Sequence, residues 1–140
     1  MGTSRTFSNE EIDAFVIANK KGHFMQSPRW GQVKKEWTSR ILVSQREDGS
    51  IAGTLHVLIR KTPVFGYSLM YAPRGPVCDV HDEKTIADLI SQAKALCKEM
   101  RCYELKMDPD VPIEDTQFSD LMKKQGFRID TSMSGFSAAQ

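Results

Sequence analysis

The segment FMQSPRWGQVKKEW, residues 24–37, places two tryptophans among lysines. A helix over about 28–36 would make Trp30 and Lys34, four residues apart, neighbours on its surface. A lysine ammonium beside an indole ring can bind a phosphate by charge and a sugar or base by stacking. The same pattern is also typical of a helix whose Trp30 and Trp37 pack in the core while the lysines face solvent.

A second candidate is Arg74 in MYAPRGPV, residues 70–77. Pro73 and Pro76 stiffen the backbone around it, and Gly75 would let the chain approach a ligand closely. The guanidinium is a planar fork that suits phosphate or carboxylate, and a predicted helix N-terminus follows. The alternative is a rigid strand-to-helix connection with Arg74 in solvent.

A third candidate is Asp108 in MDPDV, at the end of a predicted strand. A carboxylate there could act as a base or orient an amine. Asp before Pro also commonly forms an Asx-type turn. Tyr71 and Tyr103 could face the same cleft from strand ends, or they could be packing residues.

The elements that must position these residues follow from capping and periodicity. Ser8 and Glu11 form a capping box, Ser27 followed by Pro28 is a typical helix start, and EDGS after residue 46 indicates a hairpin turn. Apolar spacing predicts helices over about 9–20, 28–36, 83–100 and 115–125, and strands over 41–45, 51–60, 65–72, 102–108 and 127–131. The order predicts an α/β (α+β) fold with a mixed sheet flanked by helices, and it is similar to the order of the GNAT-like acetyltransferase arrangement.

We expect a single domain over residues 1–140, with the first six residues outside the ordered part. A formal net charge of +1 excludes a generally basic nucleic-acid or membrane-surface binder, although a local basic patch is compatible with it. No apolar run approaches the roughly 18 residues of a membrane-spanning helix, so we expect no transmembrane segment. Cys78, Cys97 and Cys102 lack metal-type spacing, and the three histidines are scattered. These features predict reduced thiols, a cytoplasmic protein and no metal site.

A coenzyme A site is also disfavoured. The fold would need a glycine-rich run of backbone N–H groups to hold the pyrophosphate. The candidate loop PRGPVCDV has one glycine, and its prolines remove donors. We therefore expect no cofactor.

Three motifs together, QSPRWGQVKKEW, YAPRGPV and YELKMDPDV, resemble the Fem family (FemABX type). Members of this family are aminoacyltransferases that build the interpeptide bridges of peptidoglycan. The resemblance runs over about residues 24–127 and implies a protein of two GNAT-like halves, of which this chain resembles the first. It implies a truncated fragment that is inactive alone and contains part of the precursor-binding site.

The resemblance also implies a reaction in which a stem-peptide amine attacks the ester carbonyl of an aminoacyl-tRNA, without coenzyme A or metal. Lys34 matches a family lysine that contacts the precursor phosphate, and Asp108 matches an aspartate considered as a base. Arg74 and Gly75 match a (K/R)GP element with a supporting role. The implied partners are a UDP-linked or lipid-linked muropeptide and, through the missing second half, aminoacyl-tRNA. The implied context is cell-wall synthesis, cell shape and methicillin resistance.

Two other functions fit the sequence. One is a non-catalytic GNAT-like module that binds a partner or forms a homodimer through an exposed sheet edge. The other is a coenzyme A-dependent acetyltransferase, which the loop chemistry disfavours. Under the Fem-family hypothesis, the substrate-binding residues are Trp30, Lys34, Trp37, Tyr71, Arg74, Gly75 and Tyr103.

Overall fold

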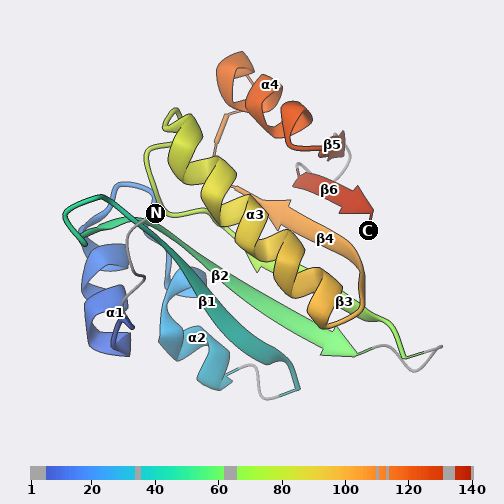
Figure 1. Cartoon of the computed structure of the whole chain (residues 1–140), viewed down its shortest axis with the longest axis horizontal. Helices are drawn as coiled ribbons and strands as arrows, with labels where there is room; N and C mark the ends of the chain where they lie inside the picture. The colour runs from blue at the N-terminus through green and yellow to red at the C-terminus, as the bar shows by residue number, and fades with distance from the viewer. Residues whose placement is uncertain are drawn as a thin grey trace.

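A mixed sheet with helices on both faces forms the fold (Figure 1). The structure, a computed structural model, describes residues 6–33, 36–61, 66–109, 111–112, 114–130 and 135–139. The helices are α1 (Asn9–Ala18), the 3₁₀ turn η1 (Phe24–Gln26), α2 (Pro28–Val33), α3 (Glu83–Glu99) and α4 (Thr116–Lys124). The strands are β1 (Thr38–Gln45), β2 (Ile51–Lys61), β3 (Ser68–Pro73), β4 (Cys102–Asp108), β5 (Arg128–Asp130) and β6 (Gly135–Ala139).

The strands of the described residues lie in the order β1-β2-β3-β4-β6-β5. The pairs are antiparallel except for β3 and β4, which run parallel because α3 connects them as a crossover. The predicted mixed sheet flanked by helices is therefore confirmed.

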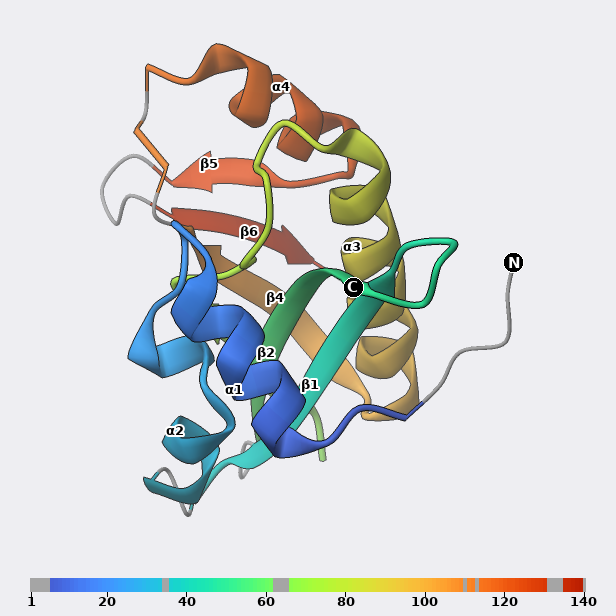
Figure 2. The ribbon, with the colours of Figure 1, turned by 90° about the vertical axis from the view of Figure 1, so that its left-hand side faces the viewer.

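The two faces of the sheet are covered differently. Helix α3 packs against β1, β2 and β4 on one face, whereas α1, η1 and α2 lie over β1 and β2 on the other (Figure 2). The α3 face holds the main core, because apolar side chains at alternate strand positions meet the apolar stripe of α3. The largest of these are buried almost completely: Leu55, Val57, Met70, Ile86, Leu89, Ile90, Leu105 and Met107.

The capping signals of the sequence appear in the structure. Ser8 forms the predicted capping box with Glu11, and the Ser27 hydroxyl accepts a hydrogen bond from the backbone N–H of Arg29 at 3.2 Å. Gly126 follows α4 at a φ of +94°, a left-handed conformation that glycine adopts at low cost.

Several boundaries differ from the prediction by a few residues, and one strand was not expected. The described part of α2 ends at Val33, before the expected end of the helix at residue 36. Strand β1 begins at Thr38, because pairing with β2 extends the ladder beyond the apolar run at 41–45. Strand β6 was not predicted, since GFSAA has too few β-branched or large apolar residues to indicate a strand.

One buried amide joins the N-terminal layer to the sheet. The Gln26 side chain is fully buried, and its Oε1 accepts a hydrogen bond from the His56 N–H at 2.8 Å. Its Nε2 donates to the carbonyl oxygens of His56 at 3.1 Å and Pro73 at 2.7 Å. Gln26 therefore connects η1 to the middle of β2 and to the end of β3.

We expect Gln26→Leu to destabilise the fold by about 2–4 kcal/mol, because it leaves buried backbone groups of His56 and Pro73 without partners. Urea unfolding followed by circular dichroism measures the change. Gln32→Leu, on the exposed face of α2, is the matched control and should change stability by less than about 0.5 kcal/mol. Equal losses in the two variants would contradict the role assigned to Gln26.

Candidate functional site

Asp108 and Tyr71 meet where the parallel strands β3 and β4 end. The register places Asp108 beside Pro73. The Tyr71 hydroxyl donates to Asp108 Oδ2 at 2.9 Å, and the backbone N–H of Arg74 donates to Asp108 Oδ1 at 2.7 Å. Both carboxylate oxygens are thus engaged by the chain, and the cluster lies at the carboxyl ends of two adjacent parallel strands.

The Tyr71 phenol is a neutral donor in this cluster. Burial, with the hydrogen bond to Asp108 and the negative charge of that carboxylate, raises the pKa of Tyr71 to about 12. The hydroxyl therefore keeps its proton near neutral pH and donates a hydrogen bond to Asp108.

The arginine of the proline-flanked loop is held in an unusual backbone conformation. Arg74 has a φ of +57°, in the left-handed region that non-glycine residues seldom adopt. The hydrogen bond from its N–H to Asp108 helps to hold that conformation. The side chain is exposed, so the guanidinium is available to an anion beside the strand ends.

Gly75 faces the interior rather than an open ligand site. A Cβ at this position would lie 2.7 Å from Leu55 Cδ1 and 2.8 Å from Gln26 Nε2. The missing side chain therefore lets the loop pack on Gln26, and the close approach expected from the sequence is made to the protein itself. A contact between Gly75 and substrate remains a prediction.

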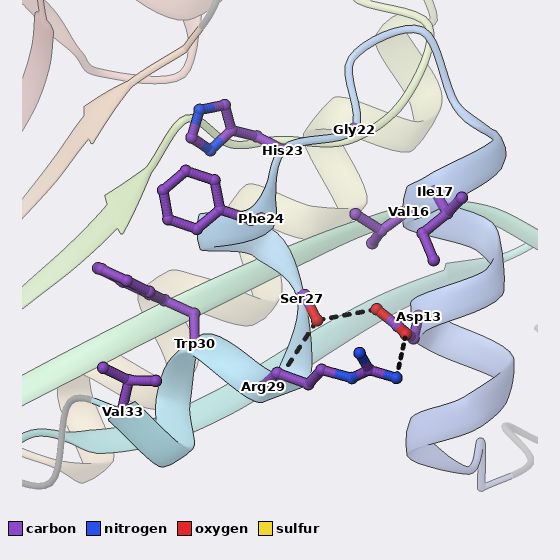
Figure 3. Close-up of a pocket in the computed structure, with 10 residues that line it drawn as sticks. All are labelled: Asp13, Val16, Ile17, Gly22, His23, Phe24, Ser27, Arg29, Trp30 and Val33. Atoms are coloured by element: carbon purple, nitrogen blue, oxygen red, sulfur yellow. Dashed lines mark hydrogen bonds and ion pairs between the residues drawn. The ribbon is translucent and has the colours of Figure 1, made fainter.

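The aromatic segment before and within α2 borders a groove. The His23 and Phe24 rings stack at 4.6 Å between centroids, and Phe24 meets Trp30 edge-on at 5.1 Å. A groove of about 520 Å³ lies between this segment and α1 (Figure 3). Trp30 is half-buried, so its ring combines packing with an accessible surface.

The structure does not place the two tryptophans on one helical stripe. Val33 is 68% exposed, and Trp37 lies beyond the described helix, where the Arg60 guanidinium sits 5.8 Å from its ring centroid. Lys34 lies outside the described residues. The expected pairing of Lys34 with Trp30 therefore remains a prediction.

Tyr103 does not join Tyr71. The register places Tyr71 beside Lys106, which lies three residues beyond Tyr103 on β4. The two tyrosines are therefore separated by about 10 Å along the strand direction. Tyr103 is 45% exposed at the start of β4. The single cleft proposed for both tyrosines is thus not formed between them, and a substrate contact of Tyr103 is still untested.

The sequence reasoning missed two polar residues on the face of the sheet opposite α3. Lys106 lies between Glu104 and Asp108 at alternate positions of β4, and its Nζ is 3.5 Å from a Glu104 carboxylate oxygen. His56 is the other, and its Nδ1 is 2.9 Å from the Met25 carbonyl while its Nε2 is 2.6 Å from Ser39 Oγ. Alternation of polar with apolar residues in YELKMD was the available signal for Lys106.

The imidazole of His56 is neutral in this arrangement. A carbonyl oxygen only accepts, so Nδ1 carries the proton and Nε2 accepts from the Ser39 hydroxyl. Burial lowers the pKa of His56 from its ordinary value of 6.5. His56 thus holds η1 and β1 to β2 rather than serving as an exposed base.

The remaining sequence predictions concern metals, thiols and membranes. Cys78, Cys97 and Cys102 are free and buried, and burial raises the pKa of the Cys78 and Cys97 thiols to about 12. Among the described residues no group of His, Cys, Asp or Glu has the geometry of a metal site. None of the described helices has the length and apolar character needed to cross a bilayer. The edge-mediated homodimer remains a prediction, with β1 as one edge of the described sheet.

Known proteins resemble this chain along most of its length. The FemAB family model matches residues 7–133. A lipid II:glycine glycyltransferase of Staphylococcus aureus (strain MRSA252) is 35% identical over 124 residues, covering 86% of this chain and 29% of that protein. The counterpart in strain bovine RF122 / ET3-1 is 34% identical over 124 residues, with the same shares of each chain covered. The chain therefore spans less than a third of these relatives.

Solved structures give the same picture. The crystal structure of FemX superposes with a TM-score of 0.84 at 31% identity, covering 89% of this chain and 31% of FemX. A probable acetyltransferase superposes with a TM-score of 0.61 at 13% identity, covering 88% of this chain and 87% of that chain. The second likeness shows the fold alone and confirms the GNAT-like prediction.

His56 predicts a specific pH dependence of stability. Its folded-state pKa lies below the unfolded value, so the unfolded chain binds more protons between the two values. The contribution is complete above the unfolded value and is lost as the pH falls through the folded value. We expect the free energy of unfolding to fall as the pH drops below about 6.5. Urea titrations across this range should show the slope in the wild type and in His23→Gln but not in His56→Gln. A slope that persists in His56→Gln would contradict the assignment.

Proposed function

Because the chain belongs to the FemAB family, we propose that it is part of an aminoacyltransferase acting on a peptidoglycan precursor. The relatives named lipid II:glycine glycyltransferase support this proposal. Since the chain covers 29% of those proteins, we assign to it part of the precursor site, and we assign aminoacyl-tRNA binding to the remainder. We expect the chain alone to be inactive and its setting to be cytoplasmic.

The proposed reaction is aminoacyl transfer to the stem peptide. The amine nitrogen attacks the ester carbonyl carbon of aminoacyl-tRNA, a C–N bond forms, and the C–O bond to the ribose breaks. The amine loses a proton, and the ribose oxygen gains one. This chemistry requires an oriented amine, a group that accepts its proton and a site for the precursor phosphates.

The observation that carries the proposal is the cluster of Tyr71, Arg74 and Asp108. Ligands of α/β sheets commonly bind beyond the carboxyl ends of parallel strands, which is where this cluster lies. The exposed Arg74 guanidinium suits a phosphate or carboxylate of the precursor. In this proposal Lys34, Trp30 and Trp37 extend the binding surface along the N-terminal layer, with Gly75 and Tyr103 at its margins.

Two roles for Asp108 follow from the cluster. As a base, it would accept the amine proton on a lone pair that Tyr71 and Arg74 leave free, because a carboxylate offers about four acceptor sites. As a positioning residue, it would act through Arg74, whose N–H it binds. The two roles differ in their effect on binding.

We expect Arg74→Ala to weaken binding of a UDP-linked muropeptide by roughly tenfold, since a charge-assisted contact is lost. Chemical-shift titration of the labelled chain measures the dissociation constant. Arg40→Ala, an exposed arginine on β1, is the matched control and should bind like the wild type. Loss of binding in Arg40→Ala, or none in Arg74→Ala, would count against a precursor site at Arg74.

A double-mutant cycle separates the roles of Asp108. If Asp108 positions Arg74, Asp108→Ala should weaken muropeptide binding, and the double variant should bind no more weakly than Arg74→Ala. If Asp108 acts only as a base, Asp108→Ala should bind like the wild type. Additive losses would show that Asp108 contacts the ligand independently of Arg74.

A further inference from the structure

Strand β4 carries three charged side chains on the face of the sheet opposite α3. Leu105 and Met107 are buried in the core beneath α3, so the alternate residues Glu104, Lys106 and Asp108 lie on the other face. Successive members of this set are about 6.5 Å apart along the strand. Their charges alternate in sign, with the cation between the two carboxylates. We call these three residues the β4 charge row.

The β4 charge row leads directly to the candidate site. Lys106 pairs in register with Tyr71 of β3. The Tyr71 hydroxyl in turn donates to Asp108 Oδ2 at 2.9 Å. Lys106 therefore lies one row of side chains before Asp108, and Arg74 follows on the other side of Asp108, beyond the end of β3. The two cations thus stand on opposite sides of the same carboxylate.

Lys106 is accessible although β4 is an inner strand. Strand β4 runs between β3 and β6 and packs against α3 on its other face (Figure 1). The Lys106 side chain is nevertheless 43% exposed, and that of Glu104 is 23% exposed. Exposure of this extent on an inner strand shows that the face opposite α3 is open to solvent at Lys106. A ligand that lies across the sheet here can therefore reach the ammonium group.

The ion pair with Glu104 does not account for a lysine at this position. Lys106 Nζ is 3.5 Å from a Glu104 carboxylate oxygen, longer than the roughly 2.7–2.9 Å of a charge-assisted hydrogen bond. An ion pair this exposed adds little to stability, and lysine is depleted in strands. An ammonium group has three donors, so one carboxylate contact leaves donors for a ligand.

We propose that Lys106 binds a carboxylate of the precursor peptide while the amine to be acylated lies at Asp108. This inference rests on the proposed function and adds which part of the substrate β4 recognises. A peptide is a ligand that brings both groups, an amine for Asp108 and a carboxylate for Lys106, and complementary charges fix its register on the strand. An extended peptide spans the distance of about 6.5 Å between the two positions in two residues.

The precursor phosphates suit Arg74 better than Lys106. The Arg74 side chain is exposed, and its guanidinium is a planar fork that fits phosphate oxygens. Lys106 stands between two carboxylates, which offset most of the positive potential that a diphosphate needs. A peptide carboxylate carries a single charge and is positioned by the rest of the peptide, so a partly neutralised ammonium is sufficient for it.

Titration of two ligands into one set of variants tests the proposal. The ligands are a UDP-linked muropeptide and the same muropeptide with its peptide carboxylates converted to amides, and chemical shifts of the labelled chain give each Kd. We expect the wild type to bind the amidated ligand roughly tenfold more weakly, since a charge-assisted contact is lost. Lys106→Met should bind both ligands alike at the weaker affinity, and Lys106→Arg should keep most of the preference for the acidic ligand.

Two further variants separate ligand binding from the ion pair. Lys124→Met removes the lysine of another exposed pair, which lies 3.3 Å from Glu83, and should bind both ligands like the wild type. Glu104→Gln releases Lys106 from its pair and should bind the acidic muropeptide at least as tightly as the wild type. Circular dichroism checks that each variant is folded.

Four outcomes overturn the proposal while the proposed function stands, because in each the wild type still binds the muropeptide. They are equal affinity of the wild type for the two ligands, equal affinity of Lys106→Met and the wild type for the acidic ligand, a loss in Glu104→Gln that matches the loss in Lys106→Met, and an equal loss in Lys106→Met for a UDP-sugar without peptide. The last outcome would place a phosphate at Lys106. Absence of muropeptide binding by the wild type overturns both proposals.

Discussion

The arrangement of the candidate site depends on the buried amide of Gln26. A side chain with one acceptor and two donated bonds satisfies three backbone groups, on β2 and at the end of β3. In the interior each of those groups would cost free energy if left unpaired, so the amide fixes one relative position of η1, β2 and the Arg74 loop. Gln26 therefore holds the η1 turn near the N-terminus in a fixed position relative to the end of β3, 47 residues later in the chain.

Close packing at two glycines and a hydrogen bond from Arg74 to Asp108 also hold these elements in place. A Cβ at Gly31 would lie 2.3 Å from Ser39 Oγ, and one at Gly75 would lie 2.8 Å from Gln26 Nε2, so both glycines allow backbones to approach where a side chain would not fit. Asp108 then holds the Arg74 N–H from the β4 side. The loop is thus held from two strands, which lets an exposed guanidinium project from a defined backbone. Rigid support of this kind is what a binding group needs to act without a large loss of entropy.

The sequence predicted the elements well because their signals are local. The capping box at Ser8, the Pro28 start and the apolar stripe of residues 83–100 each depend on contacts within a few residues. The site was predicted less completely, since its geometry arises from contacts over long sequence distances. Gln26 and His56 carry no motif, and nothing in a polar residue's identity tells that it will be buried. A glycine between prolines predicts a close approach without naming the partner. In the structure that approach is to Leu55 and Gln26, and a contact of Gly75 with substrate stays a prediction.

The two faces of the sheet carry different kinds of side chain, an apolar core beneath α3 and polar residues on the opposite face. On the α3 face, Leu105 and Met107 of β4 are buried in the main core. On the opposite face the alternate positions of the same strand carry Glu104, Lys106 and Asp108, which are half-buried and polar. Register places Tyr71 opposite Leu58, two residues from His56 on that strand, so the polar cluster lies on the face that η1 and α2 also cover. Substitutions at these polar positions therefore leave the core beneath α3 in place, whereas replacing Gln26 removes the partner of three buried backbone groups.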